Sequence, residues 1–160
     1  MEIADLSTVE LISLYSRIIS IMKERKVIRS KNLLGDLGEF LVIEYFANTP
    51  SLPILQSAPS GTRNVDAISR RGERYSIKST TGNLTGSFWG LNPPESESPD
   101  VQEFEFLLIA CFNGDYQLTQ IIQLTWDEFL KFKSWNKRMN CWKISITKAL
   151  LKECIIHEIN

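Results

Sequence analysis

Apolar residues recur every three or four positions in two segments near the start of the chain, which is the spacing of an amphipathic helix. Residues 5–26 carry such a stripe, and the last turn of this segment is positively charged, as the helix dipole favours. Residues 34–48 carry a broader apolar surface, and Pro50 and Pro53 end that helix. A helix that is apolar on most sides is buried on most sides, so we expect the second helix to pack against a core.

Shorter apolar or alternating runs follow, and their length and turn signals predict strands. They cover residues 54–57, 64–69, 74–80, 104–112, 116–124 and 142–146. The run at 104–112 is apolar at most positions, which is typical of a central strand covered on both faces. Residues 81–100 contain several Gly and Pro residues and form a long loop, and loops of this length are usually functional or disordered. Further helices are expected at 126–132, capped by Thr125, and at 147–156.

The order of these elements predicts an α/β fold in which a mixed sheet of about five strands is flanked by helices. A chain of 160 residues suits a single domain spanning residues 1–160. Within it we expect an N-terminal helix at 1–30, a core at 34–125, and C-terminal helix and strand elements at 126–160.

Composition narrows the functional classes. The net charge is −1, so any attraction to nucleic acid must come from a local basic patch. The N-terminus lacks the features of a signal peptide, and the apolar runs are too short to span a bilayer. Three cysteines at no metal-like spacing are typical of reduced, buried thiols. We therefore expect a cytoplasmic protein with no membrane association.

The single histidine, His157, lies four residues from the end of the sequence. Zinc sites built from His and Cys and Ser-His-Asp triads need histidines that this chain lacks. Hydrolytic chemistry would therefore rest on carboxylates, a lysine and a hard metal ion.

Glu39, Asp66 and Lys78 are the candidates for such chemistry. Each has an ordinary explanation: a surface glutamate beside the sheet, an edge-strand aspartate paired with an arginine, and a solvated lysine. Together, a carboxylate on a helix, one on a hairpin strand and a lysine on the next strand can converge. Two carboxylates can hold Mg²⁺, which can polarise a phosphodiester and activate water, and the ammonium can stabilise the developing charge.

Three segments carry a resemblance to a known family: residues 35–39 (GDLGE), 65–67 (VDA) and 75–78 (YSIK). They resemble the PD-(D/E)xK nuclease superfamily, which has the restriction-endonuclease-like fold. They are also similar to an uncharacterised bacterial family with a G-D-x-x-E helix and D-A-I and I-K strands. The resemblance implies a Mg²⁺-dependent DNA endonuclease of the restriction or genome-defence type, with Mn²⁺ able to substitute.

The resemblance also implies a role for each matching residue. Asp66 would be the central metal ligand, Glu39 a further acidic group near the metal, Ile77 a ligand through its backbone carbonyl, and Lys78 the catalytic lysine. The sequence departs from the family at Ser76, where an acid should stand. Glu39 supplies the missing carboxylate, or Ser76 holds a metal-bound water, or the site is inactive. The alternative functions are an inactive DNA-binding or accessory subunit that keeps the fold, and an interaction domain that does not bind nucleic acid.

Residues near the hairpin and in the long loop are the candidate DNA contacts: Arg63, Arg70, Arg71, Arg74, Thr80 and Asn83. Solvated turn charges and a disordered insertion are the ordinary explanations of these two groups. Double-strand cutting with one site per chain implies a homodimer or a partner subunit, and the N-terminal helix is a candidate interface.

The hairpin register is a geometric condition on this hypothesis. Opposed residues in an antiparallel pair point to the same face, and a slip of one residue reverses every side chain. A two-residue turn would send Asp66 and Lys78 to opposite faces. We therefore expect a three-residue loop or a bulge, with Gly72 at positive φ, that places Asp66 opposite or near Lys78.

Overall fold

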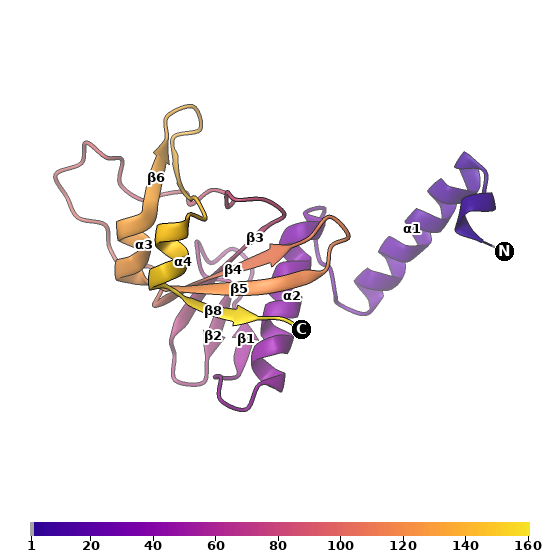
Figure 1. Ribbon diagram of the computed structural model, residues 1–160, viewed down its shortest axis with the longest axis horizontal. Coiled ribbons are helices and arrows are strands. Elements are labelled where there is room, and N and C mark those ends of the chain that lie inside the picture. The colour runs from indigo at the N-terminus through magenta and orange to yellow at the C-terminus, as the bar shows by residue number, and fades with distance from the viewer. Residues whose placement is uncertain (1) are drawn as a thin grey trace.

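The computed structural model describes residues 2–160. Helices come first, a run of strands follows, and short helices and strands form the C-terminal part (Figure 1). In chain order they are η1 (Ile3–Asp5), α1 (Thr8–Glu24), α2 (Leu33–Asn48), β1 (Leu55–Ser57), β2 (Ala67–Ser69), β3 (Arg74–Thr80), β4 (Phe106–Phe112), β5 (Leu118–Thr125), α3 (Trp126–Phe132), β6 (Lys133–Asn136), β7 (Cys141–Ile144), α4 (Lys148–Glu153) and β8 (Ile155–Glu158).

Six of the strands form one mixed sheet in the order β1-β2-β3-β4-β5-β8. Strands β3 and β4 are parallel, and every other neighbouring pair in this sheet is antiparallel. Strands β6 and β7 form a separate two-stranded sheet. The predicted α/β fold with a mixed sheet flanked by helices is confirmed, with six strands in the main sheet instead of about five.

Strand β4 lies inside the sheet and is covered on both faces, as its apolar run predicts. The four residues from Leu107 to Ala110 have no exposed surface. Leu108 and Ala110 pack in one apolar cluster with α2, and Leu107 and Ile109 pack in another that includes residues of α3 and β7. Burying each of the larger side chains contributes about 1.5–3 kcal/mol, so this strand is a main source of stability.

Helix α2 packs closely on the sheet because Gly38 has no side chain. A Cβ atom at Gly38 would lie 1.8 Å from the Ser79 hydroxyl, which no real contact allows. Val42 and Phe46 continue the buried stripe of the helix. The side chain of Asn32 caps the helix by accepting the Gly35 N–H. This packing fixes the position of the residue after Gly38, which is Glu39.

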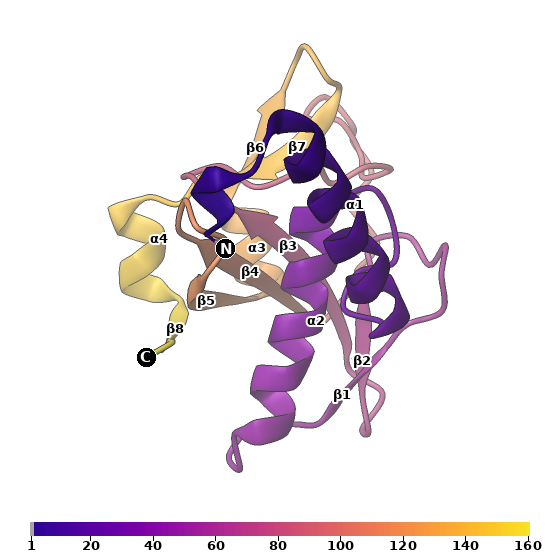
Figure 2. The same cartoon turned by 90° about the vertical axis from the view of Figure 1, so that its right-hand side faces the viewer.

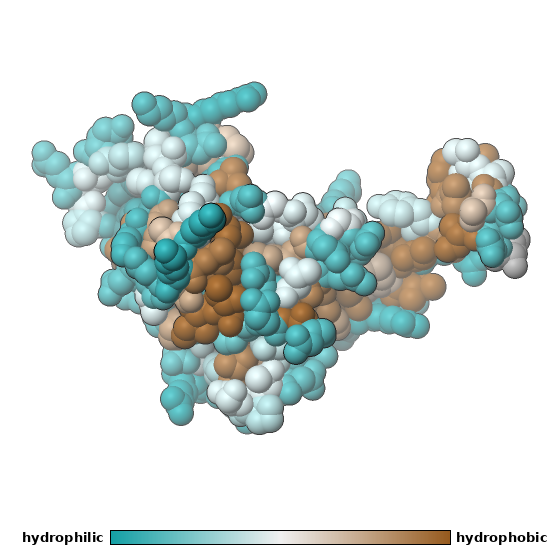
Figure 3. All heavy atoms as spheres, viewed as in Figure 1, coloured by the Kyte–Doolittle hydropathy of each residue, from teal (hydrophilic) through white to brown (hydrophobic). Residues whose placement is uncertain are grey.

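Helix α1 projects away from the sheet (Figures 1 and 2). A capping box at Ser7 begins it, yet none of its residues is buried. The apolar stripe expected over residues 5–26 is exposed, with Val9, Ile12 and Tyr15 at 76%, 65% and 63%. Apolar surface therefore covers much of α1 (Figure 3). No helix within residues 2–160 is both long enough and apolar enough to cross a membrane.

The C-terminal part agrees with the prediction in one helix and differs in two places. Helix α3 spans the predicted residues and is capped by Thr125. The expected helix at 147–156 is wrong beyond Glu153, because β8 follows and pairs with β5 at the edge of the sheet. The β-branched Ile155 and Ile156 favour that strand. The four-residue β6 was not predicted.

The segment between β3 and β4 is packed, although it contains no regular strand. Leu84 and Phe88 form isolated bridges to the β7 region, and Thr85 and Phe88 are buried. Asp100 forms an ion pair with Lys133, and both side chains are almost completely buried. These contacts contradict the interpretation of residues 81–100 as a disordered insertion.

Candidate active site

The β2–β3 hairpin has the odd-residue connection that the hypothesis requires. Ala67 pairs with Tyr75 and Ile68 with Arg74, which leaves a three-residue connection at 70–72 beyond the bonded Ser69 and Glu73. Gly72 has a φ of +85°, as expected. The strand begins at Ala67, however, so Asp66 precedes the strand and does not lie in its middle. The register also places Asp66 level with Ser76 and Ile77, not opposite Lys78.

The chain leaves the regular ladder at Asp66. Its N–H donates to the Tyr75 carbonyl at 2.8 Å, while its own carbonyl accepts the Ala58 N–H at 2.8 Å. Its carboxylate Oδ2 accepts the Ile77 N–H at 2.7 Å. The carboxylate therefore lies beside the edge of β3 where β2 has ended, within reach of both faces of the sheet.

Burial raises the pKa of the Asp66 carboxyl above its usual value, and the Ile77 N–H and the charge of Lys78 oppose that rise. Keeping this carboxylate ionised therefore costs the folded protein free energy unless a cation is near. A buried carboxylate that lowers the stability of the folded protein is more typical of a functional site than of a structural role.

Lys78 lies on the sheet face that carries the long loop. Its Nζ is 4.9 Å from the centroid of the Phe88 ring, which is completely buried. Burial lowers the pKa of Lys78, and the negative charges of Asp66 and Glu39 act in the opposite direction. Among residues 2–160 no carboxylate lies within 4.0 Å of this ammonium. Lys78 is therefore a desolvated cation held near two carboxylates without being paired to either.

Glu39 reaches the same region from α2. Burial raises the pKa of its carboxyl, the charge of Asp66 raises it further, and Arg29 opposes both. Arg29 Nη2 lies 2.5 Å from Glu39 Oε2. Asp36 holds the turn that presents Arg29, because its Oδ2 accepts the Arg29 N–H at 2.7 Å and also the Ser30 N–H. Asp36 and Glu39 of the G-D-x-x-E segment therefore both act on Arg29.

A cleft of about 320 Å³ brings these groups together. Asp36, Glu39 and Asp66 line it with Arg29, and residues 58–62 complete most of the remaining lining. Lys78 is not part of the lining. The arrangement is one cleft with three carboxylates and a guanidinium, and a buried ammonium behind the Asp66 carboxylate.

Ser76 does not behave as a surface ligand. Its side chain is completely buried, and it lies close enough to the Asp66 carboxyl to lower the pKa of that group. Ile77 is better placed, because the N–H and carbonyl of one strand residue point to the same side and its N–H points to Asp66. One explanation of the missing acid was that Ser76 holds a metal-bound water. The burial of Ser76 does not favour that explanation.

The oxygen donors that share this edge are the carboxylates of Asp66 and Glu39 and the carbonyl of Ile77. Within residues 2–160, no three His, Cys, Asp or Glu side chains converge as a metal-binding group. Two carboxylates with a carbonyl fit Mg²⁺, because this ion keeps several waters and is commonly bound by only one or two carboxylates. The donor set suits a hard ion, and Mn²⁺ accepts the same ligands.

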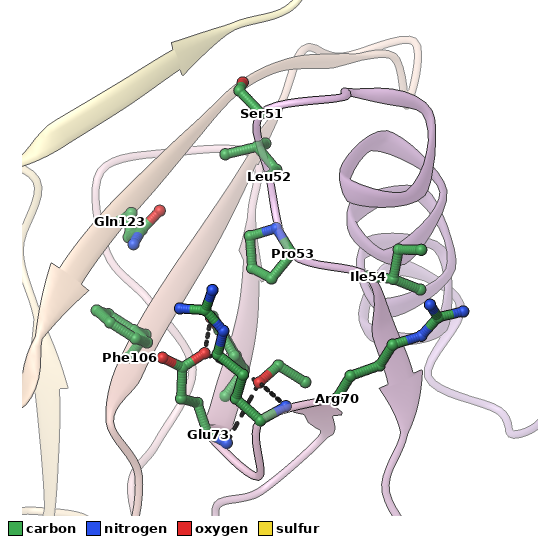
Figure 4. A pocket seen from close by; sticks show the side chains of 11 residues that line it. Ser51, Leu52, Pro53, Ile54, Arg70, Glu73, Phe106 and Gln123 are labelled. Carbon is green, nitrogen blue, oxygen red and sulfur yellow. Dashed lines mark hydrogen bonds between the residues drawn. The ribbon is translucent and has the colours of Figure 1, made fainter.

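The four predicted DNA-binding arginines do not surround this cleft. Arg63 pairs with Glu103, and Arg74 pairs with Glu105 at 2.7 Å, so two of the four charges are compensated by the protein's own carboxylates. Arg70 and Arg71 line a different cavity of about 510 Å³. It lies at the turn of the hairpin, where Arg70 extends beside Ile54 (Figure 4).

The two predicted contacts in the long loop differ in exposure. Thr80 is buried, and its hydroxyl donates to the Leu84 carbonyl and accepts the Gly82 N–H. Asn83 is exposed, and its carbonyl accepts the Ile146 N–H. Thr80 therefore holds the start of the loop, whereas Asn83 presents its side chain at the surface. The role of both residues as DNA contacts stays a prediction.

Two residues at the site were missed by the sequence analysis. Arg29 lies in the connector before α2, and Phe88 lies in the long loop between β3 and β4. The turn held by Asp36 and the bridge between Phe88 and Trp142 are both tertiary features. The Asp36 carboxylate, seven residues after Arg29, is too weak a local signal to have predicted the contact between Arg29 and Glu39.

Comparison with known proteins gives no independent assignment. No family model matches this sequence, and no curated protein matches it. The geometry of the cleft therefore has to carry the functional argument.

Proposed function

We propose that this protein is a metal-dependent DNA endonuclease with a restriction-endonuclease-like core, of the restriction or genome-defence type. The observation that carries the proposal is the Asp66 carboxylate, which the Ile77 N–H fixes at the edge of β3. Glu39 lines the same cleft, and Lys78 lies close enough for its charge to act on Asp66.

The electrostatics of the cleft support a cation ligand. The pKa values of Asp66 and Glu39 are both raised, and burial is the largest cause in each case. Two desolvated carboxylates in one cleft favour a divalent cation, because the ion offsets the repulsion between them. Mg²⁺ held by Asp66, Glu39 and the Ile77 carbonyl would polarise a phosphodiester and lower the pKa of a bound water.

Lys78 has a separate part in this proposal. Its ammonium is desolvated beside Phe88, and a buried charge interacts more strongly with a developing negative charge than a solvated one does. We assign it the stabilisation of the phosphate in the transition state. An uncharged residue of similar length, as in Lys78→Met, removes that interaction and keeps the packing against Phe88.

Plasmid cleavage tests the proposal. Supercoiled plasmid is incubated with the protein and Mg²⁺ or Mn²⁺, and EDTA serves as the control. We expect cutting that EDTA abolishes, and loss of at least a hundredfold in rate for Asp66→Asn and for Lys78→Met. Asp115→Asn is the matched control, since Asp115 is an exposed turn residue. Cutting that survives Asp66→Asn would place the active site elsewhere.

A second function is favoured by one observation, the burial of Ser76 where the family has an acid. A site that lacks an acid at this position is consistent with a DNA-binding or accessory subunit that keeps the fold without catalysis. A gel shift of duplex DNA without cutting in Mg²⁺ or Mn²⁺ would favour this alternative.

The proposal includes a second copy of the chain and a cytoplasmic location. Double-strand cutting with one site per chain needs two copies, and α1 exposes an apolar stripe that would be covered in a dimer. Cys111, Cys141 and Cys154 are all free thiols, as expected in a reducing compartment. Sedimentation of the wild type and of Ile12→Asp tests the dimer, and an unchanged mass would contradict an α1 interface.

A further inference from the structure

Positive charge is concentrated in one segment of this nearly neutral chain. Residues 129–152 contain seven Lys or Arg residues and no Asp or Glu. The remaining 11 basic residues stand against all 19 acidic ones, so the rest of the chain has a net charge of −8. Positive and negative charges are therefore separated along the chain, although the net charge of the whole sequence is only −1.

The segment contains the basic hairpin, which we define as residues 133–144, comprising β6, β7 and their turn. Lys133 is used inside the protein, in its buried ion pair with Asp100. Lys137 and Arg138 lie in the turn, are exposed, and have no ion pair among residues 2–160. Lys143, on β7, is half-buried and also lacks an ion pair within the described part of the chain. The hairpin therefore presents uncompensated charge at its tip.

The hairpin is held rigidly enough to present these charges in a fixed place. The rings of Trp135 and Trp142 pack edge to face with centroids 5.1 Å apart, and Lys133 Nζ lies 4.0 Å from the centroid of the Trp142 ring. The Asn136 side chain accepts the Met139 N–H at 3.0 Å and closes the turn. A preorganised hairpin loses little entropy on binding a partner.

The hairpin is also connected to the candidate active site. Phe88 exchanges two backbone hydrogen bonds with Trp142 of β7, at 2.9 and 3.2 Å. The same Phe88 ring lies under the Lys78 ammonium. The hairpin therefore rises from the sheet face that carries Lys78, at the opposite end of the molecule from the β2–β3 turn (Figures 1 and 2). Its tip is covered by hydrophilic side chains (Figure 3).

We propose that the basic hairpin binds the phosphate backbone of duplex DNA through Lys137, Arg138 and Lys143. A two-stranded ribbon fits a groove of duplex DNA, and Lys and Arg at its tip and edge meet the phosphates on either side. The tip has too little apolar surface for membrane insertion, which needs a continuous apolar face. This inference deepens the proposed function, on which it rests for the choice of DNA, and replaces the arginines of the β2–β3 turn as the main contact.

Binding is measured by fluorescence anisotropy with a labelled 20-base-pair duplex in EDTA, so that no cutting occurs. The test variant is the double change Lys137→Gln and Arg138→Gln. The matched control is Arg70→Gln and Arg71→Gln, which removes the same charge from the turn of another hairpin. Circular dichroism and the melting temperature establish that both variants fold.

We expect the hairpin variant to bind at least tenfold more weakly than the wild type and the control to bind within about twofold of it. Each lost phosphate contact lowers the slope of log K against log salt by about 0.9, so the hairpin variant should lose about 1.8. Equal weakening of both variants, an unaffected hairpin variant, or a wild type that does not bind the duplex would overturn the inference. Tighter binding to an RNA duplex of the same sequence would overturn the choice of DNA.

The result is separable from the test of catalysis. A wild type that binds DNA through the hairpin and never cuts in Mg²⁺ or Mn²⁺ would defeat the nuclease and keep the inference. If the hairpin variant cuts and binds DNA as well as the wild type does, the nuclease proposal stands and the inference about the hairpin fails.

Discussion

Asp66 and Ile77 are joined by a hydrogen bond of 2.7 Å from the Ile77 N–H to the Asp66 carboxylate. This bond takes the place that the next backbone carbonyl of β2 would fill if the strand continued. It fixes Oδ2 of the carboxylate beside the residue that precedes Lys78. The other oxygen, Oδ1, is the one on which the proposed metal site depends.

The Asp66 charge should lower the stability of the metal-free protein. A raised carboxyl pKa means that the folded state binds the proton more tightly than the unfolded state. The cost is therefore present above the folded pKa and disappears as the pH falls below the unfolded value. Asp66→Asn, which can still accept the Ile77 N–H, should raise the melting temperature at pH 7 by about 2–4 °C, the effect of about 1 kcal/mol.

Scanning calorimetry at neutral and acidic pH checks this expectation. The gain should shrink at acidic pH, where Asp66 is protonated in the wild type as well. A lower melting temperature for Asp66→Asn at pH 7, with Asp115→Asn unchanged, would mean that the carboxylate stabilises the fold.

The cleavage rate should have a bell-shaped dependence on pH. Activity requires ionised Asp66 and Glu39, whose pKa values are raised, and a protonated Lys78, whose pKa is lowered. Both limbs should therefore lie closer to neutrality than ordinary carboxyl and lysine titrations would place them. Higher Mg²⁺ should move the acidic limb to lower pH, because the ion stabilises the ionised carboxylates. An acidic limb that does not respond to Mg²⁺ would show that neither carboxylate binds it.

Arg29 should compete with the metal for Glu39. Its guanidinium already lies against the Glu39 carboxylate at 2.5 Å, so metal binding must displace or share this contact. Arg29→Met should tighten Mg²⁺ binding by a few fold, measured by calorimetric titration of the metal alone. Arg25→Met, in the cap of α1, is the control. Weaker binding in Arg29→Met would mean that Arg29 organises the site instead of competing for it.

Restoring the acid of the family pattern tests whether position 76 faces the metal. Ser76 is buried beside the Asp66 carboxyl, so Ser76→Glu adds a further buried carboxylate to those of Asp66 and Glu39. We expect this variant to be less stable than the wild type without metal, by roughly 1–3 kcal/mol, and to gain more stability from Mg²⁺. Ser79→Glu on the α2 side of the same strand should lose stability without the gain. Equal metal stabilisation in Ser76→Glu and the wild type would mean that position 76 does not reach the metal.

The buried pair of Asp100 and Lys133 should hold the long loop against β6. Removing one partner leaves an uncompensated buried charge, so Asp100→Ala should cost about 3–5 kcal/mol of unfolding free energy in urea. Combining Asp100→Ala with Lys133→Met should recover much of this loss. Additive losses in the double variant would indicate that the two charges do not interact.

Some of these features follow from the sequence alone. Helix α2, strand β3 and helix α3 lie within a residue of their predicted bounds, because their signals are local: an apolar period, an alternating run, a capping threonine. The central place of β4 follows from its continuous apolar run. The odd-residue hairpin connection was also predicted, because Asp66 and Lys78 can share one face of the sheet only with such a connection. The order of Glu39, Asp66 and Lys78 along these elements identified the candidate site, which stays a prediction.

Only the tertiary structure decided the surroundings of that site. Glu103 and Glu105 compensate Arg63 and Arg74 from about 30 to 40 residues away in sequence. Phe88 reaches β7 across 54 residues, Arg29 turns onto Glu39, and β8 joins β5 instead of extending α4. Local propensity records what a segment favours within a few residues. Which charges are compensated and which apolar faces are covered depends on contacts that form only when distant segments close on one another.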